Sequence, residues 1–470
     1  MTRLAASSTG RTAGEPLETK PAVQPSVVIS LSGAGGPDTA ATYPRPSMPV
    51  WQMHSDDAVT MRIARQYNVE TNTGRFSGIG AALVGQFGSS GADFAQSVSL
   101  HPSASSASTA FNLKITTASG KAVTFSLMGS EGELAVQTTA SDGLDDSERA
   151  AVAKLADGFQ SAIDGMAGQP PKLDLTALAG FDKGELASVD FSASTASDGQ
   201  PPMTLALHAD ATSRAVKVTS GAGTIDIGVD DASAAILGTG AQRTAAMANY
   251  LDQIDKATAR GHGDRALAAM FKDAFTELNA ADDAKPGSTN VASPQRSKSE
   301  HAMLSGLADF HASFAQRAVA SNPMHPDEVD GFSYDVSQST HMGAADTRNR
   351  ELSQQRSSHL LASFHSPLSG GSLALTGSPS SQNYLYTQID DKSSSQADIA
   401  YRNGIMVKAA LTLSASQSTH QMKYVMGKLV EDTMTPVTHS ATRDALELLD
   451  NGQDDAVNQS ARLESDPSKL

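Results

Sequence analysis

The chain has 470 residues, with 35 basic and 51 acidic side chains, a net charge of −16 and no cysteine. This length is enough for about two or three domains with buried cores. The lack of Cys excludes disulfides, thiolate nucleophiles and Cys-ligated zinc or iron–sulfur clusters, and the acidic balance argues against unaided binding of duplex nucleic acid, which requires a basic face.

Residues 1–75 are rich in Ser, Thr, Ala, Gly and Pro without a sustained hydrophobic period, which predicts a disordered leader. Trp51, the only Trp, is expected to dock on the body of the protein. The following stretch, 76–100, is rich in glycine and contains Gly-Ile-Gly at 78–80. Leu83 stands where a dinucleotide-binding loop needs its third glycine, so we interpret this stretch as turns or flexible connections.

The segment from Phe111 to Phe191 is the clearest folding unit of a predicted α+β region, 76–282. Apolar and polar residues alternate over 111–115 and 123–127, on both sides of a Gly-containing loop, which predicts an antiparallel hairpin. Residues 133–137 are expected to add a third strand.

A capped helix is predicted to follow this hairpin. Asp145 and Glu148 have the spacing of a capping box, in which each side chain bonds the backbone of the other. Apolar residues then recur every three or four positions and form one stripe, which predicts a helix on the dry face of the hairpin. The stripe consists of Val152, Leu155, Phe159, Ile163 and Met166.

Further strands and a helical pair complete the first region. Alternation over 203–229 predicts strands, and two amphipathic stretches, 242–260 and 264–280, predict helices. The short glycine-containing link between them indicates an antiparallel αα-hairpin. Residues 283–298 hold Pro and Gly without an apolar period and are predicted to be a linker.

The second region, 299–450, is predicted as one helix followed by antiparallel strands. Ser297 and Glu300 match a capping box, and a stripe at spacings of four, three and four predicts the helix; the stripe is Met303, Leu307, Phe310 and Phe314. Alternation from Phe332 onwards predicts strands.

Turn and cap signals divide the remainder of this region. The pair Asn403-Gly404 between apolar segments predicts a type I′ hairpin turn, because both central residues need positive φ. Ser440 is expected to cap a final helix that ends at Leu449, and residues 451–470 are predicted to be a frayed tail.

Paired carboxylates are the first candidates for chemistry. Asp-Asp doublets occur at 56–57, 145–146, 230–231, 282–283, 390–391 and 454–455. Such pairs are able to bind a divalent ion or act in acid–base catalysis. Nearly all fall at predicted element ends, where Asp caps helices and makes turns, so we interpret them as structural.

Histidine is the second candidate. None of the His residues has the His-Glu-x-x-His spacing of a zinc protease, and the chain has no Gly-x-Ser-x-Gly elbow or phosphate-binding loop. His341, His359, His365 and His420 lie in the strand-rich part, where folding is able to gather them. We predict no catalytic, cofactor-binding or metal-binding residue.

The resulting hypotheses concern a soluble, acidic α+β protein in which antiparallel hairpins pack against amphipathic helices in two structured regions. The first is a non-enzymatic protein-interaction protein, which binds another protein or itself, binds no nucleic acid and has no membrane span. It is expected to be cytoplasmic, or exported by a leaderless route. The alternatives are a hydrolase-type enzyme with a site assembled from distant residues, and a self-assembling structural protein.

Overall fold

The computed structural model describes residues 49–470 except 54, 70, 100–108, 131–132, 196–200, 232–235, 281–297 and 345–347. They belong to one compact unit, Ser47–Leu470. Within these described ranges, no helix is both long enough and apolar enough to cross a membrane.

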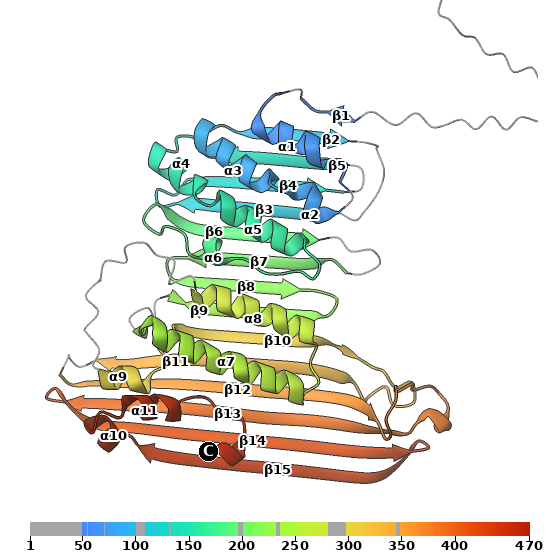
Figure 1. Ribbon diagram of the computed structural model, residues 1–470, viewed down its shortest axis with the longest axis vertical. Coiled ribbons are helices and arrows are strands. Elements are labelled where there is room, and N and C mark those ends of the chain that lie inside the picture. The colour runs from blue at the N-terminus through green and yellow to red at the C-terminus, as the bar shows by residue number, and fades with distance from the viewer. Residues whose placement is uncertain are drawn as a thin grey trace, which may run out of the picture. The chain divides into compact units, whose positions relative to one another are not determined.

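A single antiparallel sheet dominates the described part of the chain (Figure 1). Its order is β1-β2-β5-β4-β3-β6, and from β6 it continues in chain order to β15. The strands are β1 Val50–Trp51, β2 Phe94–Ser99, β3 Thr109–Thr117, β4 Ala122–Gly129, β5 Glu133–Ala140, β6 Leu186–Thr195, β7 Met203–Asp210, β8 Ser213–Thr219, β9 Gly223–Asp230, β10 Asp309–Val319, β11 Asp330–Ala344, β12 Arg350–Pro367, β13 Tyr384–Arg402, β14 Ile405–Val425 and β15 Lys428–Asp444.

Helices cover one face of this sheet, which we call the covered face; the opposite face we call the bare face (Figure 1). The helices are α1 Ala58–Gln66, α2 Asn72–Phe76, α3 Ile79–Ser90, α4 Asp146–Ala153, α5 Ala156–Ala167, α6 Thr176–Ala179, α7 Gly240–Arg260, α8 Arg265–Ala280, α9 Lys298–Met303, α10 Leu446–Asp450 and α11 Asp454–Ser460. Packing of helices on antiparallel strands confirms that part of the predicted fold class, although the sheet is far larger than separate hairpins would give.

The predicted hairpin and capped helix are present. β3 pairs with β4 and β4 with β5, and the capping box of Asp145 and Glu148 is formed. The predicted stripe is wholly buried but is divided between α4 and α5. Phe159 contacts both Phe125 of β4 and Phe191 of β6, so the stripe packs on the sheet as expected.

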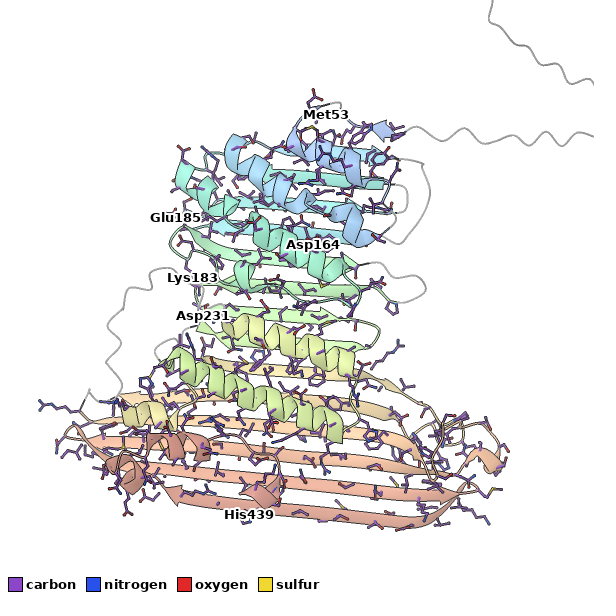
Figure 2. All side chains as sticks on the ribbon, viewed as in Figure 1. Met53, Asp164, Lys183, Glu185, Asp231 and His439 are labelled. Atoms are coloured by element: carbon purple, nitrogen blue, oxygen red, sulfur yellow. The ribbon has the colours of Figure 1, made fainter. Side chains whose placement is uncertain are left out.

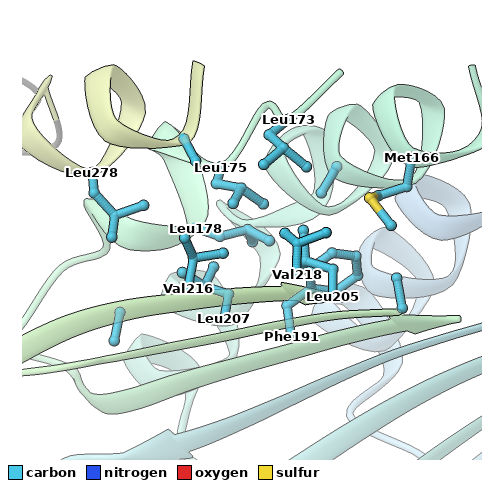
Figure 3. Packing of buried hydrophobic residues seen from close by; sticks show 14 of the residues in the cluster. Met166, Leu173, Leu175, Leu178, Phe191, Leu205, Leu207, Val216, Val218 and Leu278 are labelled. Carbon is cyan, nitrogen blue, oxygen red and sulfur yellow. The ribbon is translucent and has the colours of Figure 1, made fainter. Parts of the chain in front are cut away.

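The covered face continues as one hydrophobic core beneath the later helices (Figure 3). Leu175 and Leu178, which follow α5, lie over Leu207 of β7, with Leu278 of α8 beside them. The predicted helical pair is confirmed as α7 and α8, which contact each other and extend this layer.

The glycine-rich stretch after residue 76 is a helix, contrary to the expectation of turns or flexible connections. α3 packs against α4 and α5 so closely that a Cβ on Gly80 would lie 2.6 Å from Ile163 Cδ1, and one on Gly88 would lie 2.6 Å from Ala153 Cβ. Glycine is poor in isolated helices, but here it permits this close approach.

Part of the predicted leader is also ordered. α1 and α2 lie within or next to its C-terminal end, with Asp57 capping α1 through the backbone N–H groups of Val59 and Thr60. Trp51 packs edge-on against Tyr67, with 5.9 Å between ring centroids. It also pairs with Val98 of β2 and packs against the main core, so it docks on the body as predicted. Residues 1–48 of the predicted leader lie outside the described residues.

The helix predicted across Met303–Phe314 is wrong. α9 ends at Met303, and Phe310 and Phe314 belong to β10, where they alternate with exposed or half-buried residues. β10 pairs on one side with β9 and on the other with β11, so one sheet continues through both predicted regions. The predicted linker, 283–298, lies outside the described residues except for Lys298, which begins α9.

The C-terminal part confirms one turn prediction. Asn403 and Gly404 have φ of 53° and 82° and join β13 to β14 as a two-residue turn. A second turn of this kind, Met426-Gly427, joins β14 to β15 and was not predicted. Ser440 lies within β15 and does not cap a helix.

The predicted frayed tail instead folds back on the body. Residues 454–460 form α11, and both Val457 and Leu463 are buried. Asn249 of α7 bonds both the carbonyl oxygen and the backbone N–H of Leu463, at 3.1 and 3.2 Å.

Candidate interaction surface

β15 is an open edge of the sheet. It has 17 residues, pairs only with β14 among the described residues, and is exposed at every position except Ala441. Figure 2 shows its residue His439 on the outermost strand, while Met53 lies beside the opposite edge, where β1 has only two residues. An edge strand presents a row of backbone N–H and C=O groups that another strand is able to pair with.

Several large apolar side chains on β15 are exposed to solvent. Met434 is 66% exposed and Val437 is 50% exposed, and Leu429 and Val430 are also exposed. Contiguous exposed apolar residues on an unpaired edge mark either an interaction site or an aggregation hazard.

The bare face beside this edge is polar and built of small side chains. Ser337, Ser357, Ser394, Ser414 and Ser440 lie opposite one another on the successive strands β11 to β15. The hydroxyls of Ser337 and Ser357 are 3.0 Å apart and form a hydrogen bond. A depression of about 560 Å³ lies along this row and is also lined by His311 and His359.

Ionisable groups on the bare face form exposed pairs. His359 bonds Asp390 at 2.8 Å, and His420 bonds Asp432 at 2.6 Å. Among the described residues, no serine hydroxyl hydrogen-bonds to His359, although several serines line its depression. In serine nucleophiles activated by histidine the hydroxyl lies within hydrogen-bond reach of its base, although this contact is often longer before substrate binds.

The buried ionisable cluster on this side of the sheet surrounds His365, at the end of β12. His365 Nδ1 lies 2.7 Å from Asp330 and Nε2 lies 3.1 Å from Glu328, and its side chain is 1% exposed. Tyr384 donates its hydroxyl to Glu328 at 2.7 Å and accepts from Asn322 at 3.0 Å. Asn322 and Glu328 come from the segment 320–329, whereas Asp330 begins β11 and Tyr384 begins β13. Leu373 and Leu375 pack against the tyrosines of this cluster.

The charges in this cluster follow from its hydrogen bonds. Burial by itself acts to lower the pKa of His365. The hydrogen bonds to Asp330 and Glu328 outweigh this effect, so the pKa is raised overall. For Asp330, burial acts to raise the pKa, and the contacts with His365 and Ser321 reverse this and lower it. Burial and the neighbouring Glu328 raise the pKa of Tyr424 to about 12.

This cluster is unsuited to act as a catalytic triad. Ionised carboxylates only accept hydrogen bonds, and both ring nitrogens of His365 face a carboxylate, so this arrangement favours the imidazolium. Ser321 donates to Asp330 at 2.6 Å, and its 3.2 Å contact is with the same Nδ1 that Asp330 holds. A general base needs one ring nitrogen free to accept a proton.

The four histidines proposed for gathering lie in four different cross-strand rows. His341 lies opposite Ser353, His359 opposite Lys392, His365 opposite Tyr386 and His420 opposite Gln388. Within the described ranges, no three or more His, Asp or Glu side chains are arranged so that they could hold a metal ion.

The aspartate doublets take different roles. Asp57 and Asp145 cap helices as predicted. Asp231 instead forms buried ion pairs with Arg214, at 2.5 Å, and with Lys183 (Figure 2 labels Lys183 and Asp231). The doublet 390–391 lies within β13, where Asp391 pairs with Arg260 on the covered face. The doublet 282–283 lies outside the described residues.

Sequence reasoning missed the edge position of β15. Its alternation of apolar and polar residues is weak, and Pro436 within it was the available signal, because proline inside a sheet is confined to edge strands, bulges and strand starts. Comparison of the chain with protein-family models, curated proteins and solved structures finds no match.

Proposed function

We propose that this is a non-enzymatic protein-interaction protein that binds a polypeptide strand along β15. The observation that supports this is the open, exposed edge of β15, with apolar side chains on both of its sides. Strand addition derives affinity from main-chain hydrogen bonds and specificity from alternate side chains.

The bare face adds a neighbouring surface for the same interaction. Its serines, threonines and ion pairs are exposed, so a partner could contact them without first removing a deeply buried charge from its surroundings. A strand added to β15 would extend this face, so that its side chains continue the polar rows of β11 to β15.

Photo-crosslinking tests the proposal in the intact chain. A photoreactive residue in place of Val430, 56% exposed on β15, should form adducts with a polypeptide, whereas one in place of Met128, 54% exposed on β4, should not. The adduct at 430 should be lost in Thr438→Pro, which removes a main-chain donor from the edge. Equal adducts at both positions, or no polypeptide adduct at 430, would contradict the proposal.

A hydrolase is the second candidate, because His359 and Asp390 are hydrogen-bonded beside a serine-lined depression. Its test is hydrolysis of chromogenic esters and peptides by the wild type and by His359→Ala. Turnover that falls at least about 100-fold in the variant would support an enzyme, and turnover that is absent or unchanged would remove this candidate.

A further inference from the structure

We propose that the strand that occupies β15 is β15 of a second copy of this chain, paired antiparallel about a two-fold axis near Val437. This inference rests on the proposed function and names its partner. A two-fold interface uses the same patch on both subunits, so each contact occurs twice.

The charges of β15 are arranged for antiparallel self-pairing. Lys428, Glu431 and Asp432 lie toward one end of β15, and Arg443 and Asp444 lie toward the other. When Val437 faces its own copy, Glu431 lies opposite Arg443, and the same contact recurs by symmetry. A parallel pairing in register would instead place each charge beside its like, which destabilises a cross-strand pair.

Both charged groups remain able to make this contact. Glu431 is 60% exposed, and its pairing with Lys423 is a surface contact of 3.5 Å. Arg443 donates from Nη2 to the carbonyl oxygen of Leu470 at 2.9 Å. The arginine side chain has further N–H donors in its planar guanidinium, so a second acceptor is compatible with that bond.

Pro436 removes one main-chain hydrogen-bond donor from the edge that would pair. Proline has no N–H, and within an edge strand it is tolerated where its nitrogen points away from the neighbouring strand. Alternate residues share this direction, so Met434, Thr438 and Ser440 direct their donors outward from β14. The outward edge thus loses one donor, and the segments on both sides of Pro436 keep theirs.

The exposed apolar side chains of β15 would lose contact with water if a second strand paired with this edge. In the same register, Val437 contacts its own symmetry copy, and Met434 lies opposite Ser440. Val437 and Met434 are half or more exposed in one chain, and cross-strand contacts would cover part of this surface.

The test is the molar mass of the full chain across a range of concentrations, by size exclusion with light scattering. The wild type should approach twice the 48.6 kDa of one chain. Glu431→Arg and Arg443→Glu should each weaken the dimer by at least about tenfold, because each places like charges together twice. The double variant should recover wild-type affinity.

Two further variants make the result specific. Thr438→Pro should weaken the dimer without a change of charge. Glu351→Arg is the matched control, since it removes a comparable surface ion pair, Glu351 with Arg402 at 2.7 Å, away from β15; it should leave the dimer unchanged.

A wild type that stays monomeric at every concentration overturns the self-pairing, as does a dimer that is indifferent to the charge swap. The proposed function fails separately: a monomeric chain that still crosslinks another protein through position 430 retains the interaction role and loses only the second copy as its partner.

Discussion

His365, near the end of β12, links the segment 320–329 to the sheet through a buried cluster of ionisable side chains. Its imidazolium bonds Asp330 and Glu328, and the rings of Tyr384 and Tyr386 lie 4.9 and 4.7 Å from it. Removal of one partner from such a cluster leaves uncompensated charge behind. The cluster therefore acts as a structural clasp between strand β12 and residues 320–330.

The stability that His365 contributes should depend on pH. Its folded-state pKa is raised above the ordinary value of about 6.5, so its contribution is complete below that pH and is lost as the pH rises through the folded-state pKa. We expect His365→Gln to lower the free energy of unfolding by about 3 kcal/mol near pH 6, and by less in alkaline solution. Urea unfolding followed by circular dichroism measures both.

His359→Gln is the control for this prediction, because His359 forms an exposed pair with Asp390. Its loss should cost at most about 1 kcal/mol. If His365→Gln lowers the free energy of unfolding by the same amount at every pH, then His365 stabilises the fold through its packing and not through its charge.

At the scale of elements, α3 shows how packing overrides helix propensity. Its glycines reduce intrinsic helix stability, yet Gly80 and Gly88 are contact points with α5 and α4. In the strands, by contrast, the sequence pattern and the burial agree. In β3, for example, buried residues alternate with more exposed ones, as the alternation of apolar and polar residues predicts.

Two glycines within α3 give a matched pair of substitutions. A Cβ on Gly80 would lie 2.6 Å from Ile163 Cδ1, which would have to move, and 3.1 Å from Phe159 Cδ1, whereas Gly85 has nothing within 4 Å of a Cβ. Gly80→Ala should therefore lower the free energy of unfolding by about 1–3 kcal/mol, and Gly85→Ala should raise it by about 0.5–1 kcal/mol. Thermal or urea unfolding distinguishes them, and equal effects of the two changes would contradict this account of α3.

At the scale of the whole molecule, the hydrophobic core of the covered face runs from Val59 to Leu463. The last residues therefore belong to the same core as the first helix, although they are distant in sequence. Ser395 of β13 donates to the carbonyl oxygen of Ala461 at 2.8 Å, and Gln253 of α7 accepts from the backbone N–H of Ser465 at 3.1 Å. These contacts fasten the C-terminal segment across α7 and the sheet.

The C-terminal segment should accordingly contribute to the stability of the whole. Leu463 is 1% exposed, so Leu463→Ala should lower the free energy of unfolding by about 2–4 kcal/mol. Ser468→Ala, in the exposed last turn, is expected to change it by less than about 0.5 kcal/mol. Calorimetry of both variants is the measurement, and a neutral Leu463→Ala would show that this segment is dispensable.

Local signals in the sequence were sufficient for many elements. The hairpin of β3 and β4, the capping box at Asp145 and the turn at Asn403 are each determined within a few residues, by alternation, by a side chain that bonds its own backbone, or by positive φ. They were predicted correctly for that reason.

Other features were decided only by tertiary structure, because they depend on partners that are far away in the chain. Ile227 of β9 lies opposite Ala312 of β10, and this pairing turned a helical spacing at Phe310 and Phe314 into a strand. Asn249 of α7 bonds the backbone of Leu463, whose side chain is buried, and, against the effect of burial, the carboxylates of Asp330 and Glu328 raise the pKa of His365. The open edge is likewise a property of the complete sheet, since a strand is an edge only when no other strand takes the place beside it.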